Sequence, residues 1–218
     1  MRLPIFLTIL LVLLASPLTA QIDIGIKGGL NFADLRPAPT YLGEGPRTGF
    51  AAGVYLDINI IELVSIQPEV LFSTKGYSAE HHFTQFGYPN DSKQTFINSY
   101  IELPILVKYA VPLPIFSPCL YAGPDVGFLV GAILKTHLSG TAPVDPFFTT
   151  FAPYSFSSED NLLYHTMRID YGLAVGGSVH FFVARIDARY TIGLKRVTDD
   201  RPDNFNRVWS LMLELPIF

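Results

Sequence analysis

Polar and apolar residues alternate one by one along eight stretches of this chain. In residues 22–32, for example, Ile22, Ile24 and Ile26 fall on one side of an extended backbone, and Asp23 and Lys27 fall on the other. This period of two predicts β-strands with one apolar and one polar face. The predicted strands are residues 22–32, 50–60, 64–75, 101–109, 120–131, 168–180, 184–195 and 209–217.

The links between these stretches are alternately long and short. The long links are residues 33–48, 77–95, 133–165 and 197–206, and the short ones are 61–62, 110–117 and 181–183. Tight turns at one end and long loops at the other are typical of membrane barrels. The sequence therefore predicts an all-β fold, an eight-stranded antiparallel up-and-down transmembrane β-barrel. We expect both termini in the periplasm and residues 35–47, 77–95, 134–165 and 197–206 at the cell surface.

Residues 1–20 have the features of a secretory signal peptide. Arg2 supplies a positive start, residues 3–14 are an apolar run, and residues 16–20 include small residues suited to cleavage. The apolar run is too short to span a bilayer as a helix. We therefore expect a signal peptide at 1–20, a barrel domain at 21–218, and a location in the outer membrane of a Gram-negative bacterium.

The polar faces of the predicted strands carry charges of both signs. In a soluble, lipocalin-like barrel these faces would meet water and the apolar faces would line a cavity. Acidic and basic residues occur in nearly equal numbers on these polar faces. This balance instead favours a confined polar interior, because an unpaired buried charge is costly. An eight-stranded barrel is just wide enough for side chains to fill. We therefore expect a packed lumen with a structural salt-bridge network, in which Glu69 with Lys108 and Asp187 with Arg189 are candidate pairs. The expected network comprises Lys27, Asp57, Glu69, Glu102, Lys108, Asp125, Asp170, Arg185, Asp187 and Arg189.

Three prolines interrupt the predicted strands. Pro68, Pro104 and Pro124 each lack the N–H group that a ladder hydrogen bond requires. Because a closed barrel has no free edge to accommodate them, we expect a bulge at each position.

Composition excludes several classes of function. The formal net charge is −4, and removal of Arg2 with the signal peptide would make it −5. Nucleic-acid binding calls for a clustered basic face, so no nucleic-acid partner is expected. The single cysteine, Cys119, cannot form an internal disulfide. His81 and His82 are adjacent in a predicted loop, without the spacing of a metal motif, so we expect no metal and no cofactor.

The sequence predicts no catalytic residues. A lipid-acting enzyme would need a nucleophile and a base at the outer rim of the barrel, such as Ser157 or Ser158 beside His165. The chain has neither a nucleophile elbow nor the spacing of a catalytic triad around these residues. We therefore expect that the protein is not an enzyme.

The third long link is rich in aromatic residues. So many aromatic side chains in an exposed loop indicate either a plug over the barrel mouth or a surface that binds a partner. The residues concerned are Phe147, Phe148, Phe151, Tyr154 and Phe156.

Six segments of the chain match a known pattern. They are residues 25–31 (GIKGGLN), 67–76 (QPEVLFSTKG), 100–109 (YIELPILVKY), 121–124 (YAGP), 170–177 (DYGLAVGG) and 189–194 (RYTIGL). These segments resemble the PorT-type outer-membrane β-barrel family of Bacteroidetes. The resemblance covers essentially the whole mature chain and implies the barrel fold rather than a particular activity. The namesake of the family is implicated in a protein secretion system, and the family has no agreed catalytic residues to transfer.

Together these features predict a structural or partner-binding protein. We expect a monomeric barrel in outer-membrane lipid that contacts other envelope proteins through its long loops. Two alternatives stay open at this point: a small, porin-like channel and a lipid-modifying outer-membrane enzyme.

Overall fold

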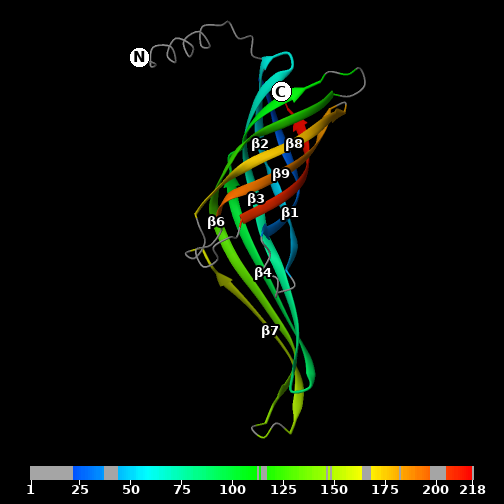
Figure 1. The fold of residues 1–218 in the computed structure, drawn as a ribbon, viewed down its shortest axis with the longest axis vertical. Coiled ribbons are helices and arrows are strands. Elements are labelled where there is room, and N and C mark those ends of the chain that lie inside the picture. The colour runs from blue at the N-terminus through cyan, green and yellow to red at the C-terminus, as the bar shows by residue number, and fades with distance from the viewer. Residues whose placement is uncertain are drawn as a thin grey trace.

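The computed structural model describes residues 22–36, 44–111, 113, 117–145, 147, 149–163, 168–181, 183–196 and 205–217. These residues form ten antiparallel strands (Figure 1). The predicted signal peptide lies outside the described residues. The strands are β1 (Ile22–Arg36), β2 (Glu44–Ile61), β3 (Val64–Gln85), β4 (Tyr88–Glu102), β5 (Ile105–Ala110), β6 (Ser117–Pro143), β7 (Phe151–Asn161), β8 (Ile169–Phe181), β9 (Ala184–Arg196) and β10 (Phe205–Pro216).

Hydrogen bonding closes the sheet into a ring. β1 pairs with both β2 and β10, and the order runs on through β9, β8, β6, β4 and β3 back to β2. β4 and β5 share one place in this ring, between β3 and β6, and only residues 103 and 104 separate them. The wall therefore has eight strand positions, and the predicted fold class is confirmed. The additional strand, β7, pairs with β6 beyond the wall.

Side chains alternate between the inside and the outside of this wall. On β1, Lys27 and Asn31 are buried, whereas Ile26 and Leu30 are 46% and 50% exposed. The other strands of the wall repeat this pattern, with charged and amide groups inside and large apolar residues outside. An outer belt of this kind suits contact with hydrocarbon and is the opposite of the lipocalin arrangement.

Within the described part of the chain, no helix has the length and hydropathy needed to cross a membrane.

Only one of the three prolines breaks its strand. Pro104 lies in the gap between β4 and β5. The predicted bulges are wrong at all three positions. Pro68 lies opposite Ile105 and Pro124 opposite Leu173 in regular register. The register is also the same before and after Pro104, with Glu102 opposite Leu71 and Ile105 opposite Pro68, so the gap contains no extra residue. On its other side Pro68 falls where the β2–β3 ladder lacks a pair, so the missing N–H is accommodated without an extra residue.

The two ends of the barrel differ in length. At one end, here called proximal, are the turn between β2 and β3, the turn between β8 and β9, the start of β1 and the end of β10. At the opposite, distal end, β3, β4 and β6 run on far past the wall and are joined by β7 (Figure 1). We call this extension the distal sheet: residues 77–85 of β3, 88–97 of β4, 133–143 of β6, and β7.

The distal sheet replaces two of the predicted loops. Residues 77–95 and most of 134–165 form long hairpins rather than irregular links. Sequence alternation missed them because polar residues occupy both faces of β4 here, as at the neighbours Ser92 and Lys93, so no apolar stripe marks the strand. The other predicted loops, 35–47 and 197–206, lie largely outside the described residues.

Candidate functional site

The centre of the lumen is a cluster of buried charges from four strands. The ammonium Nζ of Lys27 lies 3.0 Å from Glu69 Oε1 and 2.7 Å from Glu214 Oε1. The guanidinium of Arg189 donates to both oxygens of Glu69, at 2.9 and 2.8 Å. Such bidentate contacts fix the geometry of both partners. β1, β3, β9 and β10 are thereby tied together across the barrel interior.

Neither of the two candidate pairs is a direct contact. Glu69 binds Lys27 and Arg189, whereas Lys108 donates to Asp57 at 3.1 Å. The reason is register: Lys108 lies opposite Ser65, four residues nearer the proximal end than Glu69.

Asp187 and Arg189 are also turned to different partners. Asp187 accepts a hydrogen bond of 2.5 Å from the hydroxyl of Tyr121, and its other oxygen lies 3.5 Å from Lys27. Arg189, two residues along the same strand, turns to Glu69. Two residues that share a strand face are well separated, so cross-barrel partners are nearer.

At the proximal end, two cations share one carboxylate. Lys108 Nζ and Arg185 NH1 lie 3.1 and 2.8 Å from the same oxygen, Oδ2 of Asp57. Lys108 also donates to Gln67 at 2.5 Å. Glu214 lies 3.7 Å from Arg185, and Asp23 is paired opposite Asp57 on β1.

Three carboxylates surround one ammonium group at the distal end of the lumen. Lys75 forms an ion pair with Glu102 and lies 3.7 Å from Asp170, and Asp125 lines the same small space. That space has no volume that a water molecule could occupy. Sequence reasoning placed Lys75 on an inward face but not in the network, and its role follows from cross-strand proximity alone.

An apolar layer covers the distal end of the lumen. Tyr100, Leu129 and Ala132 are buried, and Leu162 and Leu163 pack against them. The segment after β7 is held there by a hydrogen bond of 2.9 Å from the N–H of Leu162 to the carbonyl oxygen of Ala132. Charged groups therefore occupy the centre of the lumen, and apolar side chains cover them on the distal side.

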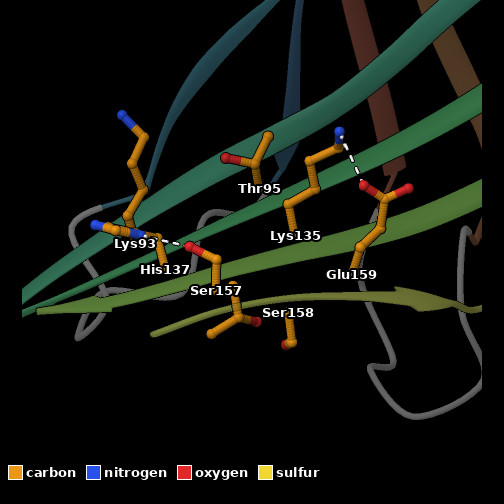
Figure 2. Close-up of a pocket in the computed structure, with 8 residues that line it drawn as sticks. Lys93, Thr95, Lys135, His137, Ser157, Ser158 and Glu159 are labelled. Atoms are coloured by element: carbon orange, nitrogen blue, oxygen red, sulfur yellow. Dashed lines mark hydrogen bonds and ion pairs between the residues drawn. The ribbon is translucent and has the colours of Figure 1, made fainter. Parts of the chain in front are cut away.

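The outward face of the distal sheet bears cross-strand pairs of opposite charge. Lys93 Nζ lies 2.6 Å from Glu80 Oε1, and Lys135 Nζ lies 3.0 Å from Glu159 Oε2. Figure 2 shows the last of these pairs beside a shallow pocket of about 370 Å³ on β4, β6 and β7. Because each lysine already faces a glutamate, the pocket has little net charge to attract an ion.

Two further pairs on this sheet involve histidine. The Nδ1 atom of His82 lies 2.5 Å from Asp91 Oδ1, and this hydrogen bond raises the pKa of His82 above its ordinary value. His137 Nδ1 lies 2.9 Å from the hydroxyl of Ser157, as Figure 2 shows. A catalytic serine–histidine pair also needs a group that orients the histidine. Among the described contacts of His137, no carboxylate supplies it, and the predicted base His165 lies outside the described residues.

The tip between β6 and β7 is organised by one acidic side chain. The carboxylate of Asp145 accepts hydrogen bonds from the hydroxyl and backbone N–H of Thr149 and from the N–H groups of Phe147 and Thr150. These hydrogen bonds, above all those from Thr149, lower the pKa of Asp145 to about 2. Asp145 is therefore ionised, and able to accept these hydrogen bonds, over the physiological pH range.

The predicted aromatic residues of this hairpin divide into two groups. Phe151 packs on Tyr88, with ring centroids 4.8 Å apart, and so joins the two hairpins. Phe147 and Phe156 are 82% and 56% exposed. Tyr154 is half-buried opposite Gly140, and Phe148 lies outside the described residues. The exposed rings lie on the distal sheet rather than over the lumen, whose cover is made by Leu162 and Leu163.

No group of three histidine, cysteine or acidic side chains is arranged to hold a metal ion within the described ranges. Cys119 is a free, buried thiol.

Comparison with known proteins identifies a family. No curated protein matches the chain. Among solved structures it is similar to the attachment invasion locus protein Ail of Yersinia pestis (12% identity, 91% of this chain and 99% of that chain, TM-score 0.34) and to Neisserial surface protein A (12%, 90% and 97%, TM-score 0.37). It is also similar to the COG4313 outer membrane channel of Pseudomonas putida F1 (10%, 92% and 97%, TM-score 0.25). The model of the outer membrane protein beta-barrel domain matches residues 15–199. That match covers most of the chain, and the protein therefore belongs to the outer membrane β-barrel domain family.

Proposed function

We propose that this protein is a non-enzymatic, monomeric outer-membrane barrel that binds another envelope protein through its distal sheet. In this proposal the short turns and termini face the periplasm and the distal sheet stands at the cell surface. The observation that carries it is the contrast between the filled lumen and the distal sheet, which extends well past the wall and exposes Phe147 and Phe156. Exposed aromatic rings are typical anchors of protein interfaces.

The resemblance to PorT-type barrels of Bacteroidetes supports the same proposal. A member of that group would serve as one component of a larger assembly in the envelope. The distal sheet is suited to this role, since its strands continue from the wall and present a fixed rather than a flexible surface.

Binding can be tested with a photo-crosslinking amino acid at position 156 in cells that express the tagged protein. We expect one stoichiometric adduct. The effect of the two phenylalanines is then measured with the crosslinker at position 154. In that protein the double variant Phe147→Ser, Phe156→Ser should reduce the amount of adduct about tenfold, the usual effect of losing interface anchors. Val183→Ser is the matched control, because Val183 is 75% exposed at the proximal end. A barrel that crosslinks only to itself or to lipid, or an adduct that the double variant leaves unchanged, would overturn the proposal.

The orientation has its own test. An epitope inserted after Phe147 should be accessible to antibody on intact cells, whereas one inserted after Val183 should become accessible only after the outer membrane is permeabilised. The reverse result would show the distal sheet in the periplasm.

A further inference from the structure

The proximal end of the lumen contains a cavity of about 160 Å³. Side chains from β2, β3, β5, β6, β8 and β9 line it, so it lies on the barrel axis rather than on the wall. A cavity of this size holds several water molecules or one small ion. It differs in this respect from the small space beside Lys75, Asp125 and Asp170, which has no room for a water molecule.

The lining of this cavity favours a negatively charged occupant. Lys108 and Arg185 both line it, and Asp57 is its sole carboxylate. The two cations use the same oxygen of Asp57. Arg185 has a second carboxylate, Glu214, at 3.7 Å, but Glu214 is also bound by Lys27 and does not line the cavity.

The remaining donors suit oxygen atoms. The ammonium group of Lys108 has three N–H donors, of which Asp57 and Gln67 accept two. Lys108 is 4% exposed, so its third donor is not consumed by bulk water. The hydroxyls of Ser65 and Ser178 line the same space.

We propose that this cavity is a binding site for a small oxyanion, with inorganic phosphate as the probe. The cationic groups supply the attraction and the hydroxyls complete the hydrogen bonds, as in other oxyanion sites of proteins. The ligand is a free ion rather than a lipid headgroup, because the wall separates the cavity from the bilayer.

Cys119 is a native reporter for this site. Its thiol lines the cavity, and the chain has no other cysteine. We expect a sulfonate-bearing methanethiosulfonate to modify it about tenfold faster than an ammonium-bearing one, the order expected for one net positive charge nearby. Both reagents need the same thiolate, so their rate ratio reports the electrostatic potential and not the reactivity of the thiol. Millimolar phosphate should slow the anionic reagent, and isothermal titration should show phosphate binding.

Two variants localise the effect. Arg185→Gln should bring the rate ratio close to one and weaken phosphate binding about tenfold. This variant is more certain to fold than a variant of Lys108, because the side chain of Arg185 is 17% exposed and that of Lys108 only 5%. Lys135→Gln removes the same charge from the distal sheet and should change neither quantity. Cys119→Ser gives the labelling blank.

Several results would overturn the proposal. Equal rates for the two reagents would show that the cavity has no positive potential. A thiol that reacts only after unfolding in urea would show that the cavity is closed to solutes. Absence of phosphate binding in the titration, with rates unaffected by phosphate, would show that the cavity holds water alone.

Discussion

Lys75 supplies the ammonium group that three carboxylates share in the distal half of the lumen. Its ammonium group pairs with Glu102 and approaches Asp170, and it also lies 5.3 Å from the centre of the Tyr100 ring. Removing the cation from a buried pair leaves carboxylates without compensation, which typically costs about 3–5 kcal/mol.

We therefore expect Lys75→Met to lower the free energy of unfolding by about 3–5 kcal/mol, measured by urea titration in phospholipid vesicles. The matched control is Lys93→Met, because the Lys93–Glu80 pair is about half exposed and should contribute less than about 1 kcal/mol. Similar losses in the two variants would contradict a special role for the buried cluster.

His82 provides a prediction about pH. The hydrogen bond and charge of Asp91 raise the pKa of His82, so the contact stabilises the folded hairpin when the imidazole is protonated. Its contribution is complete below the ordinary histidine pKa and is lost as the pH rises through the raised pKa. In an NMR titration, Asp91→Asn should lower the pKa of His82 toward the ordinary value. An unaltered His82 titration would exclude the contact in solution.

Single residues differ in how well sequence reasoning can place them. The inward position of Lys27, Glu69 and Arg189 was predictable, because alternation alone assigns a side chain to a face. Their pairing was not, because Lys27 and Glu69 are 42 residues apart and meet only through the registers of several strands. If one strand shifted by two residues against its neighbour, its side chains would still point inward or outward as before, but each would meet a different residue of the neighbouring strand.

Among the elements, β3 has a backbone conformation at Gly76 that suits glycine. This glycine has a φ of +143°, and an added Cβ would collide with the carbonyl oxygen of Phe96 on β4. It lies directly after Lys75, at the point where β3 leaves the wall and enters the distal sheet.

We expect Gly76→Val to destabilise the join between the barrel and the distal sheet by about 1–3 kcal/mol, the usual cost of a strained backbone position. Amide hydrogen exchange in residues 77–96 should rise while exchange in β1 and β10 stays slow. Gly45→Val is the control, since an added Cβ at Gly45 meets nothing within 4 Å. Uniformly faster exchange in all strands would mean that the distal sheet and the barrel wall open as one unit.

The strands of the wall and those of the distal sheet differ in how well the sequence predicts them. The strands of the wall were predictable because one of their faces is apolar. The distal strands were not, since they have polar residues on both faces and depend on pairing with β6. The bulges expected at Pro68, Pro104 and Pro124 did not follow from the sequence, because a missing N–H interrupts a hydrogen bond without requiring an extra residue in the strand.

For the whole molecule, the filled interior predicts the absence of ion conduction. Charge pairs occupy the centre of the lumen, and Leu162 and Leu163 cover its distal end. Protein inserted into a planar bilayer should give no single-channel steps at 100 mV, with insertion verified by the protease resistance of the recovered barrel. Regular steps from a verified insertion would favour the small-channel alternative.

β6 has a mechanical consequence for the whole protein. Its 27 residues run without interruption from the proximal end of the wall to the distal tip, bonded to β8 along one part and to β7 along the other. A pull on the tip along the barrel axis would load these ladders in shear, so many hydrogen bonds would share the force instead of opening one after another. A partner held at the tip would therefore be tethered to the membrane by a stiff rod, and its motion would be transmitted into the wall of the barrel.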